Sequence, residues 1–406
     1  MNHFTHLGVP DRLASILSSG GITAPFPIQE ATIPDLIAGR DVLGRAPTGS
    51  GKTLAFGIPL MMRVAKAAPG RPRGLVLAPT RELAEQISRE LTRFGKATDR
   101  WVTAVYGGVG YDAQRSQLRR GTDVLVATPG RLADLMEEGS VSLADVEIVV
   151  IDEADRMADM GFMPQVRHLM DRTNPVRQTV LFSATLDNDV AGLTQRYQTD
   201  PVNHAVGGND ANLEAAHYFW RVAQEERIDI TAEIIESATP TLVFTRTRHG
   251  ADRVARQLDR MGLRAAAIHG GRSQSQRMRA LRAFGEGRVD ALIATDVAAR
   301  GIHVEGVASV VHFDLPEDHK DYLHRSGRTA RAGAAGVVVS LVLAEQMSDL
   351  RQLQRKVGFH DALHDPDNGW LSAKGGSRVG ERPRTEEPVV RKIAYQSRSR
   401  RRSRRR

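Results

Sequence analysis

The sequence predicts an α/β fold of two tandem domains, each with a parallel β-sheet flanked by helices, followed by a disordered basic C-terminal tail. At 406 residues the chain exceeds one typical domain. Strand-like apolar runs alternate with helical stretches in two successive series, which is typical of parallel sheets covered by helices. A polar, glycine-rich segment separates the series. We therefore expect domains at 1–205 and 216–362, a linker at 206–215 and a tail at 363–406.

The expected strands are short and mostly uncharged. The uncharged run Ile148–Ile151 is typical of a strand buried on both faces of a parallel sheet. The first series starts with Asp41–Gly44, and its later strands are expected at Leu75–Ala78, Val102–Val105, Val124–Ala127, Ile148–Ile151 and Thr179–Phe182. The second series is expected at Thr241–Phe244, Ala265–Ile268, Ala291–Ala294, Val307–Phe313 and Val337–Leu341.

A loop of small residues follows the first expected strand, and a helix should start at its end. The segment reads Ala46, Pro47, Thr48, Gly49, Ser50, Gly51, Lys52, Thr53. Small residues let backbone N–H groups approach nucleotide phosphates, and a helix N-terminus favours negative charge. Lys52 could then reach the β- and γ-phosphates, and the Thr53 hydroxyl could bind Mg²⁺. The general pattern has glycine where this chain has Ala46, and the alternative interpretation is a plain turn.

Two carboxylates, Asp152 and Glu153, directly follow the apolar run 148–151. The C-terminal ends of parallel strands are where ligands bind in open α/β sheets. We expect Asp152 to be the Mg²⁺ partner and Glu153 to be the base that orients an attacking water. The alternative is an acidic start of a helix, where both residue types are favoured.

The second series has no phosphate loop but has a basic segment, His324–Arg331. Arg328 and Arg331 are three residues apart and would share one face of a helix. Two guanidinium groups aimed at a γ-phosphate would stabilise a phosphoryl-transfer transition state, a contribution of about 10³–10⁵ in rate. If another domain supplies them, hydrolysis depends on domain closure. The alternative is a solvated basic helix.

Taken together, these motifs resemble the DEAD-box family of ATP-dependent RNA helicases in superfamily 2, of a bacterial type. The match runs from about Phe4 to about Leu343, with Asp152-Glu153-Ala154-Asp155, Ser183-Ala184-Thr185 and the arginine segment in the family order. The resemblance implies RecA-like domains, ATP and Mg²⁺ as cofactors, and RNA as a partner held by its backbone without sequence preference.

The resemblance also implies an adenine site. A Q motif is expected within residues 2–30, with Gln29 bonding the adenine edge and Phe4 as the upstream aromatic residue. Ile22 and Phe26 depart from the family pattern, in which an aromatic residue and threonine are frequent. Gly301 and His303 would contact the nucleotide when the domains close, although the family usually has aspartate in place of His303.

Further roles implied by the resemblance concern RNA and the coupling of the domains. Hydroxyls, arginines and glycine amides bind phosphates without reading bases. The expected RNA-binding residues are Pro79, Thr80, Arg81, Gly107, Gly108, Thr128, Pro129, Gly130, Arg131, His269, Gly270, Gln274, Arg277, Thr295 and Asp296. The residues expected to couple the domains are Asp155, Ser183, Thr185 and His324.

Composition narrows the alternatives. The chain has no cysteine, which excludes disulfides and cysteine-based metal or redox chemistry, and its 13 histidines show no metal-ligand spacing. We expect no membrane segment, a cytoplasmic location and a monomer. The net charge of +8 is concentrated in the tail, because residues 371–406 carry 13 Lys/Arg against three Asp/Glu. Such a tail would anchor RNA through phosphate neutralisation; a merely solvated tail or a localisation signal are the alternatives.

The predicted function is RNA-stimulated ATP hydrolysis, coupled to domain closure, RNA bending and local unwinding of short duplexes or remodelling of ribonucleoproteins. Ribosomal or ribonucleoprotein particles are possible partners. An ATP-gated RNA clamp or assembly factor with little unwinding uses the same residues and stays an alternative, as does a related enzyme that acts on DNA. A small-molecule phosphotransferase explains neither the second domain nor the paired arginines.

Overall fold

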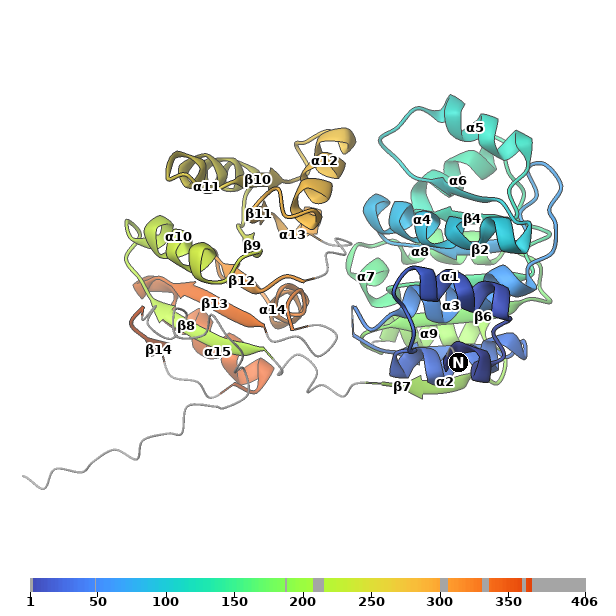
Figure 1. The fold of residues 1–406 in the computed structure, drawn as a ribbon, viewed down its shortest axis with the longest axis horizontal. Helices are drawn as coiled ribbons and strands as arrows, with labels where there is room; N and C mark the ends of the chain where they lie inside the picture. Colours follow the sequence, from blue (N-terminus) through green and yellow to red (C-terminus); the bar gives the residue numbers. More distant parts are fainter. Residues whose placement is uncertain are drawn as a thin grey trace, which may run out of the picture.

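The computed structural model describes residues 3–47, 49–186, 188–206, 215–299, 306–330, 336–359 and 363–366. It contains two lobes, a first lobe of residues 3–206 and a second lobe of residues 215–366 (Figure 1). Each lobe has its own seven-stranded sheet, in which all strand pairs are parallel. The predicted fold class of two tandem parallel-sheet domains is thereby confirmed.

The first lobe alternates strands and helices. Its strands are β1 Val42–Arg45, β2 Gly74–Leu77, β3 Val102–Val105, β4 Val124–Ala127, β5 Ile148–Ile151, β6 Gln178–Ser183 and β7 Val202–Ala205. Its helices are η1 His3–Leu7, α1 Asp11–Ser19, α2 Pro27–Ile37, α3 Lys52–Arg63, α4 Arg81–Thr98, α5 Tyr111–Arg120, α6 Pro129–Glu137, α7 Ala154–Asp159, α8 Met163–Met170 and α9 Asn188–Tyr197.

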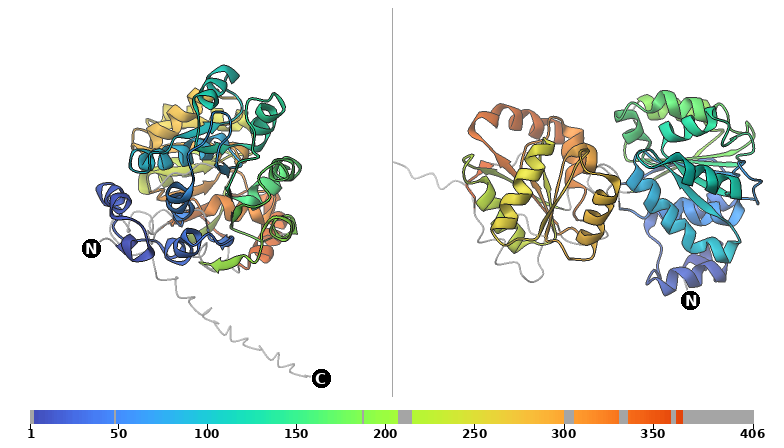
Figure 2. Two further views of the ribbon diagram at one scale, coloured as in Figure 1. Left: turned by 90° about the vertical axis from the view of Figure 1, so that its right-hand side faces the viewer. Right: turned by 90° about the horizontal axis from the view of Figure 1, so that it is seen from above.

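The first sheet is buried on both faces. Along β2, Val76 packs with helices α1–α4 on one face, whereas Leu75 and Leu77 pack with α5–α9 on the other. This alternation follows from the two-residue period of a strand. The right-hand view of Figure 2 shows the resulting arrangement of helices on both sides of each sheet.

The second lobe repeats the plan. Its strands are β8 Ala216–Arg221, β9 Thr241–Phe244, β10 Ala265–Ile268, β11 Ala291–Ala294, β12 Ser309–His312, β13 Val337–Val342 and β14 Leu363–His364. Its helices are α10 Arg227–Ser237, α11 Arg248–Arg260, α12 Gln274–Gly285, α13 Asp296–Ala299, α14 His319–Ser326, η3 Ala344–Gln346 and α15 Met347–Val357. Within the described part of the chain, every helix falls short of the length and hydropathy that crossing a membrane requires.

The expected strands are present, each within two residues of its predicted bounds. Three strands were not predicted: β7, β8 and β14. Strand β7 lies at the edge of its sheet and alternates half-buried with exposed residues, so it lacks an apolar run. Strand β14 pairs with β8 and extends the second sheet past residue 362. Most of the expected linker (207–214) and of the tail (367–406) lies outside the described residues.

The two sheets have the same topology and the same register. Their strand orders are β3-β4-β2-β5-β6-β1-β7 and β10-β11-β9-β12-β13-β8-β14, so each strand of the first lobe matches the strand seven numbers later. Ile151 pairs with Leu77 as His312 pairs with Phe244. Each strand end in the first lobe therefore has a counterpart in the second, and the residues that follow can be compared position by position.

The lobes contact each other through helices that face across the gap between the sheets. Arg277 of α12 forms an ion pair with Glu82 of α4, with 3.0 Å between Nη2 and Oε1. Lys320 of α14 forms a second pair with Asp159 of α7, at 3.6 Å. The structure therefore shows the lobes in a closed arrangement, with α12, α13 and α14 toward the first lobe (Figure 1).

Candidate functional site

The loop between β1 and α3 is wrapped around a lysine. Gly49 and Gly51 have φ of +88° and +85°, a left-handed conformation that favours glycine. Lys52 is the first residue of α3, is 7 % exposed, and donates from Nζ to the carbonyl of Ala46 at 3.0 Å. The N–H of Ala46 donates in turn to the Ser183 carbonyl at 3.2 Å, which ties the loop to β6. Thr48 lies outside the described residues.

The Q-motif segment packs directly on this loop. A Cβ on Gly51 would lie 2.3 Å from Nε2 of Gln29 and 2.6 Å from the ring of Phe26, so only glycine fits. Gln29 donates from Nε2 to the Gly51 carbonyl and accepts at Oε1 from the Phe26 N–H, both at 2.9 Å. The amide of Gln29 therefore fastens α2 to the loop. Phe26 is 40 % exposed, whereas Phe4 is fully buried in the core under α1 and α2.

The two acids that follow β5 are buried, and their pKa values move in opposite directions. Burial raises the pKa of Asp152 to about 7, against the opposing charge of Lys52. For Glu153, burial also opposes ionisation, but the charges of Arg156, Lys52 and Arg328 hold its pKa at about 2. Glu153 is therefore a carboxylate at neutral pH. It accepts from Nη1 of Arg156 at 2.6 Å and has an unusual φ of +53°, a backbone strain that occurs at functional sites.

Asp155 joins the ends of β5 and β6. Its Oδ2 accepts from the N–H groups of Ala184 and Thr185 at 3.1 and 3.0 Å, and from the Thr185 hydroxyl at 3.2 Å. Ser183 donates from Oγ to the Thr185 carbonyl at 2.6 Å. Because one carboxylate holds three donors, the segment 183–185 is fixed relative to the acids.

Two residues of the arginine segment, Arg328 and His324, lie within electrostatic reach of these acids. Arg328 is buried, and its charge contributes to the low pKa of Glu153. His324 on α14 is largely buried at the same place; burial, followed by the charge of Arg156, lowers its pKa to about 4. The structure therefore brings two predicted residues of the second lobe to the acids of the first. Arg331, Gly301 and His303 lie outside the described residues.

The other predicted residues of the first lobe gather at the starts of α4 and α6. Thr80, which follows Pro79, caps α4 by accepting from the Leu83 N–H at 3.3 Å. The guanidinium of Arg81 lies against Gly107 and Gly108, where a Cβ on Gly108 would be 1.8 Å from Nη1.

Arg131 holds the loop that follows β3 by hydrogen bonds to its backbone. Both Nη atoms donate to the carbonyl of Val109 at 3.1 Å, and its guanidinium lies 3.9 Å from the ring centre of Tyr111. Thr128, Pro129 and Gly130 form the start of α6 beside it. These contacts place hydroxyls, glycines and helix N-termini on one edge of the first lobe.

The second lobe presents its predicted residues at matching places. His269 shares a hydrogen bond of 3.0 Å between Nε2 and Oδ1 of Asp252, and Gly270 lies beside the guanidinium of Arg248. Thr295 directly precedes α13, and Asp296 is its first residue. Both amide atoms of Gln274 are buried with no hydrogen-bond partner among the described residues. Arg277 is held by Glu82 across the lobes.

Two family models match the chain: DEAD/DEAH box helicase over residues 26–193, and helicase conserved C-terminal domain over residues 226–333. Together they span more than half of the sequence. The chain belongs to the DEAD-box family of ATP-dependent RNA helicases. Among its relatives, DEAD-box ATP-dependent RNA helicase 9 of Oryza sativa subsp. japonica is 41 % identical over 87 % of this chain and 57 % of the relative. CshA of Bacillus cereus is 37 % identical over 87 % of this chain and 68 % of the relative.

Solved DEAD-box structures match both lobes at once. Saccharomyces cerevisiae Dbp5 bound to RNA and ADP BeF3 has a TM-score of 0.80 at 28 % identity, covering 92 % of this chain and 98 % of the other. A DEAD box protein of Methanococcus jannaschii has a TM-score of 0.55 at 31 % identity, covering 90 % and 99 %. The higher score, at similar coverage, shows that the lobes here are arranged more nearly as in the RNA-bound Dbp5.

The DEAD-box site has the donor set that Mg²⁺ takes in nucleotide enzymes. Among the described residues, no group of three or more His, Cys, Asp or Glu side chains could hold a metal by itself. Asp152 and Thr53 offer a carboxylate and a hydroxyl beside the phosphate loop. Mg²⁺ keeps several waters and is usually bound by one or two protein oxygens plus substrate phosphates. The residues present therefore fit a cation that enters with the nucleotide.

The structure places two residues that sequence reasoning did not select, Thr247 and Arg248, at the counterpart positions of Thr80 and Arg81. Thr247 accepts at Oγ1 from the Gly250 N–H at 2.9 Å and caps α11, as Thr80 caps α4. Arg248 is the first residue of α11, as Arg81 is of α4. The spacing was a usable signal, because Thr-Arg follows Phe244 at the same distance as it follows Leu77.

Proposed function

We propose that the chain is an RNA-stimulated ATPase that uses domain closure to bend RNA and separate short duplexes or remodel ribonucleoproteins. One observation carries the proposal: Arg328 and His324 of the second lobe are close enough to the buried acids of the first for their charges to act on one another. A nucleotide site made this way is complete only when the lobes are closed. Any ligand that favours closure will therefore promote hydrolysis.

At the nucleotide, each group has a distinct task. The backbone N–H groups of Gly49, Ser50 and Gly51 and the ammonium of Lys52 bind the β- and γ-phosphates. Mg²⁺, held by Asp152 and Thr53 partly through water, would neutralise charge on the phosphates. Glu153, kept ionised by Arg156, orients the attacking water, and Arg328 with Arg331 stabilises the charge that develops on the γ-phosphate. Gln29, Phe4, Gly301 and His303 are proposed nucleotide contacts on family resemblance.

Farther along the carboxyl ends of the strands, after β2 and β3 in the first lobe and after β9 and β10 in the second, both lobes offer groups that bind phosphate without reading bases. Thr80 and Arg81 with Gly107 and Gly108 form the first set; Thr247 and Arg248 with Gly270 form the second. The unpaired amide of Gln274 supports a ligand at this edge, because buried polar groups normally have a partner. Dbp5, which this chain resembles in the arrangement of its lobes, is bound to RNA in its structure.

Two ligands that both favour the closed state must assist each other's binding, which is linkage. On this proposal ATP and RNA are each held by residues of both lobes. Asp155, two residues after Glu153, is bonded to Ser183 and Thr185. We propose that these residues couple the two ligands. The same proposal includes monomeric action, a cytoplasmic location, ribosomal or ribonucleoprotein partners, and RNA anchoring by the basic tail. It divides the chain into a first domain at 1–205 and a second domain that begins at 216 and extends past residue 362 to β14.

A second candidate function is an ATP-gated RNA clamp. The closed arrangement favours it as much as unwinding, because both functions use the same state. Strand-separation rate and RNA residence time, measured on one preparation, distinguish the two.

The test is steady-state ATPase of the full chain with and without single-stranded RNA, beside single-stranded DNA of equal sequence. We expect RNA to stimulate turnover and DNA to do so far less, since 2′-hydroxyls allow discrimination. Glu153→Gln should lose the stimulated rate. Equal turnover with and without RNA, or activity retained in Glu153→Gln, contradicts the proposal.

A further inference from the structure

The second lobe carries an ion pair at the place where the first lobe carries its phosphate site. Lys52 is the first residue of the helix after β1, and Arg227 is the first residue of the helix after the counterpart strand β8. Glu153 is the second residue after β5, and Asp314 is the second residue after its counterpart β12. Nη2 of Arg227 lies 2.7 Å from Oδ1 of Asp314.

The surroundings of this ion pair differ from the nucleotide site of the first lobe both in the loop before the helix and in the residue that follows the strand. The loop 222–226 has one residue fewer than the loop 46–51 and contains no glycine. Phe313 stands at the counterpart position of Asp152, and the guanidinium of Arg227 lies 3.9 Å from its ring centre. Arg227 is buried and donates also to Gln224 at 3.2 Å. The second lobe therefore has an arginine–aspartate ion pair at the positions where the first lobe has Lys52 and Glu153.

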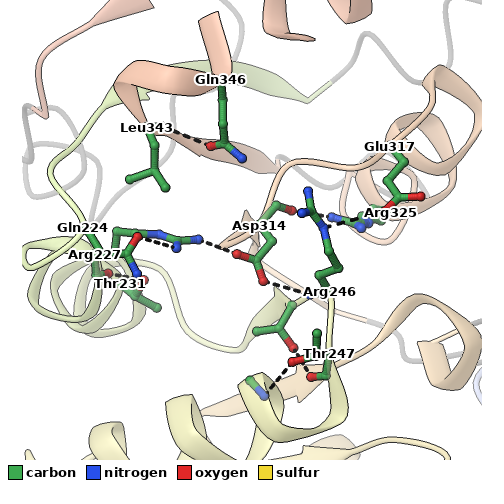
Figure 3. A network of polar contacts seen from close by, with 12 residues as sticks. Gln224, Arg227, Thr231, Arg246, Thr247, Asp314, Glu317, Arg325, Leu343 and Gln346 are labelled. Atoms are coloured by element: carbon green, nitrogen blue, oxygen red, sulfur yellow. Dashed lines mark hydrogen bonds and ion pairs between the residues drawn. The ribbon is translucent and has the colours of Figure 1, made fainter.

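Asp314 connects this pair to the arginine segment, as Figure 3 shows. Its Oδ2 accepts from the Arg246 N–H at 2.8 Å, and its carbonyl accepts from Nη1 of Arg325 at 2.7 Å. Arg325 also forms two bonds to Asp296, at 2.6 and 2.7 Å. Arg325 lies three residues before Arg328, the group that faces Glu153.

We propose that Arg227 and Asp314 are positioning residues for the arginine segment. This inference rests on the proposed function, in which Arg328 reaches the γ-phosphate and Asp296 contacts RNA. Arg325 links the two, because it lies in the same segment as Arg328 and is hydrogen-bonded to Asp296. The Arg227–Asp314 pair fixes the backbone at Asp314, on which Arg325 is anchored. The second lobe's counterpart of the nucleotide site thus positions the arginine segment that completes the nucleotide site of the first lobe.

The test is Asp314→Asn in the full chain, which keeps the shape and removes the charge. We expect kcat of the RNA-stimulated ATPase to fall about tenfold to a hundredfold, as for a small misplacement of a catalytic group. KM for ATP should stay within about twofold, because Arg328 acts mainly in the transition state. Arg227→Lys keeps the charge and should retain most of the rate. Asp290→Asn, which breaks the exposed Arg264 pair before β11, is the matched control and should change nothing.

Loss of stability must be separated from loss of positioning. The double variant Arg227→Met with Asp314→Asn leaves no buried charge unpaired, so its melting temperature should return toward that of the parent. Its kcat should stay low. A parental kcat in Asp314→Asn, or a kcat that recovers with melting temperature in the double variant, overturns the inference. An unstimulated parent would instead contradict the proposed function.

Discussion

The two lobes share one frame, strand for strand and register for register, but only one of their two functional edges is repeated. On the proposed RNA edge, the counterpart residues agree: Thr80 with Thr247, and Arg81 with Arg248. On the nucleotide edge they disagree, because Asp152 corresponds to Phe313 and the glycine loop corresponds to a shorter loop without glycine. An RNA strand that crosses both lobes needs similar contacts from each lobe. A single nucleoside triphosphate instead needs a phosphate-binding loop from one lobe and arginines from the other.

The largest effect is expected from replacing Gly51, a glycine of the first lobe's phosphate loop that the counterpart loop of the second lobe lacks. Gly51→Ala would force a side chain to φ +85°, which costs about 1–2 kcal/mol, and would press its Cβ against Gln29 and Phe26. We expect kcat/KM for ATP to fall at least about tenfold. Titration of ATP at saturating RNA measures it.

Gly161→Ala is the matched control for that experiment. Gly161 has φ of +73°, but a Cβ there would meet nothing within 4 Å, so the variant carries the backbone strain without the collision. It should lose stability without a specific rise in KM for ATP. If both variants lose ATPase equally, the fit of Gly51 against Gln29 has no special role.

A second prediction compares the RNA edges of the two lobes. Gly108 has φ of +81° and its Cβ would lie 1.8 Å from Nη1 of Arg81, whereas a Cβ on Gly270 would be 3.3 Å from Arg248. Gly108→Ala must displace Arg81, so the RNA concentration for half-maximal ATPase should rise about tenfold, as for one lost charged hydrogen bond. Gly270→Ala should raise it less than about twofold. Fluorescence anisotropy with labelled RNA checks both, and a larger effect at Gly270 would contradict the comparison.

The strands and motifs at their ends could be predicted from the sequence because parallel strands are short apolar runs and phosphate loops have a distinctive composition. The edge strand β7 could not, since its residues alternate only weakly between buried and exposed. Contacts between residues that are far apart in the sequence could not be predicted either. The sequence predicts Gln29 as an adenine contact, but its bond to the Gly51 carbonyl depends on residues 22 positions apart. Likewise, the ion pair of Arg227 and Asp314 joins residues 87 positions apart.

The smallest predicted effect concerns the exposed contact between the lobes. Asp159 and Lys320 are 27 % and 43 % exposed in their side chains, so their ion pair contributes about 0–1 kcal/mol. Asp159→Asn should raise the RNA concentration for half-maximal ATPase about twofold at low salt and hardly at all at high salt. Lys320→Glu should have a larger effect, because it places two carboxylates together, and Asp159→Lys combined with Lys320→Glu should restore the parental value. Additive losses in the double variant would show that the two side chains do not meet when the lobes close.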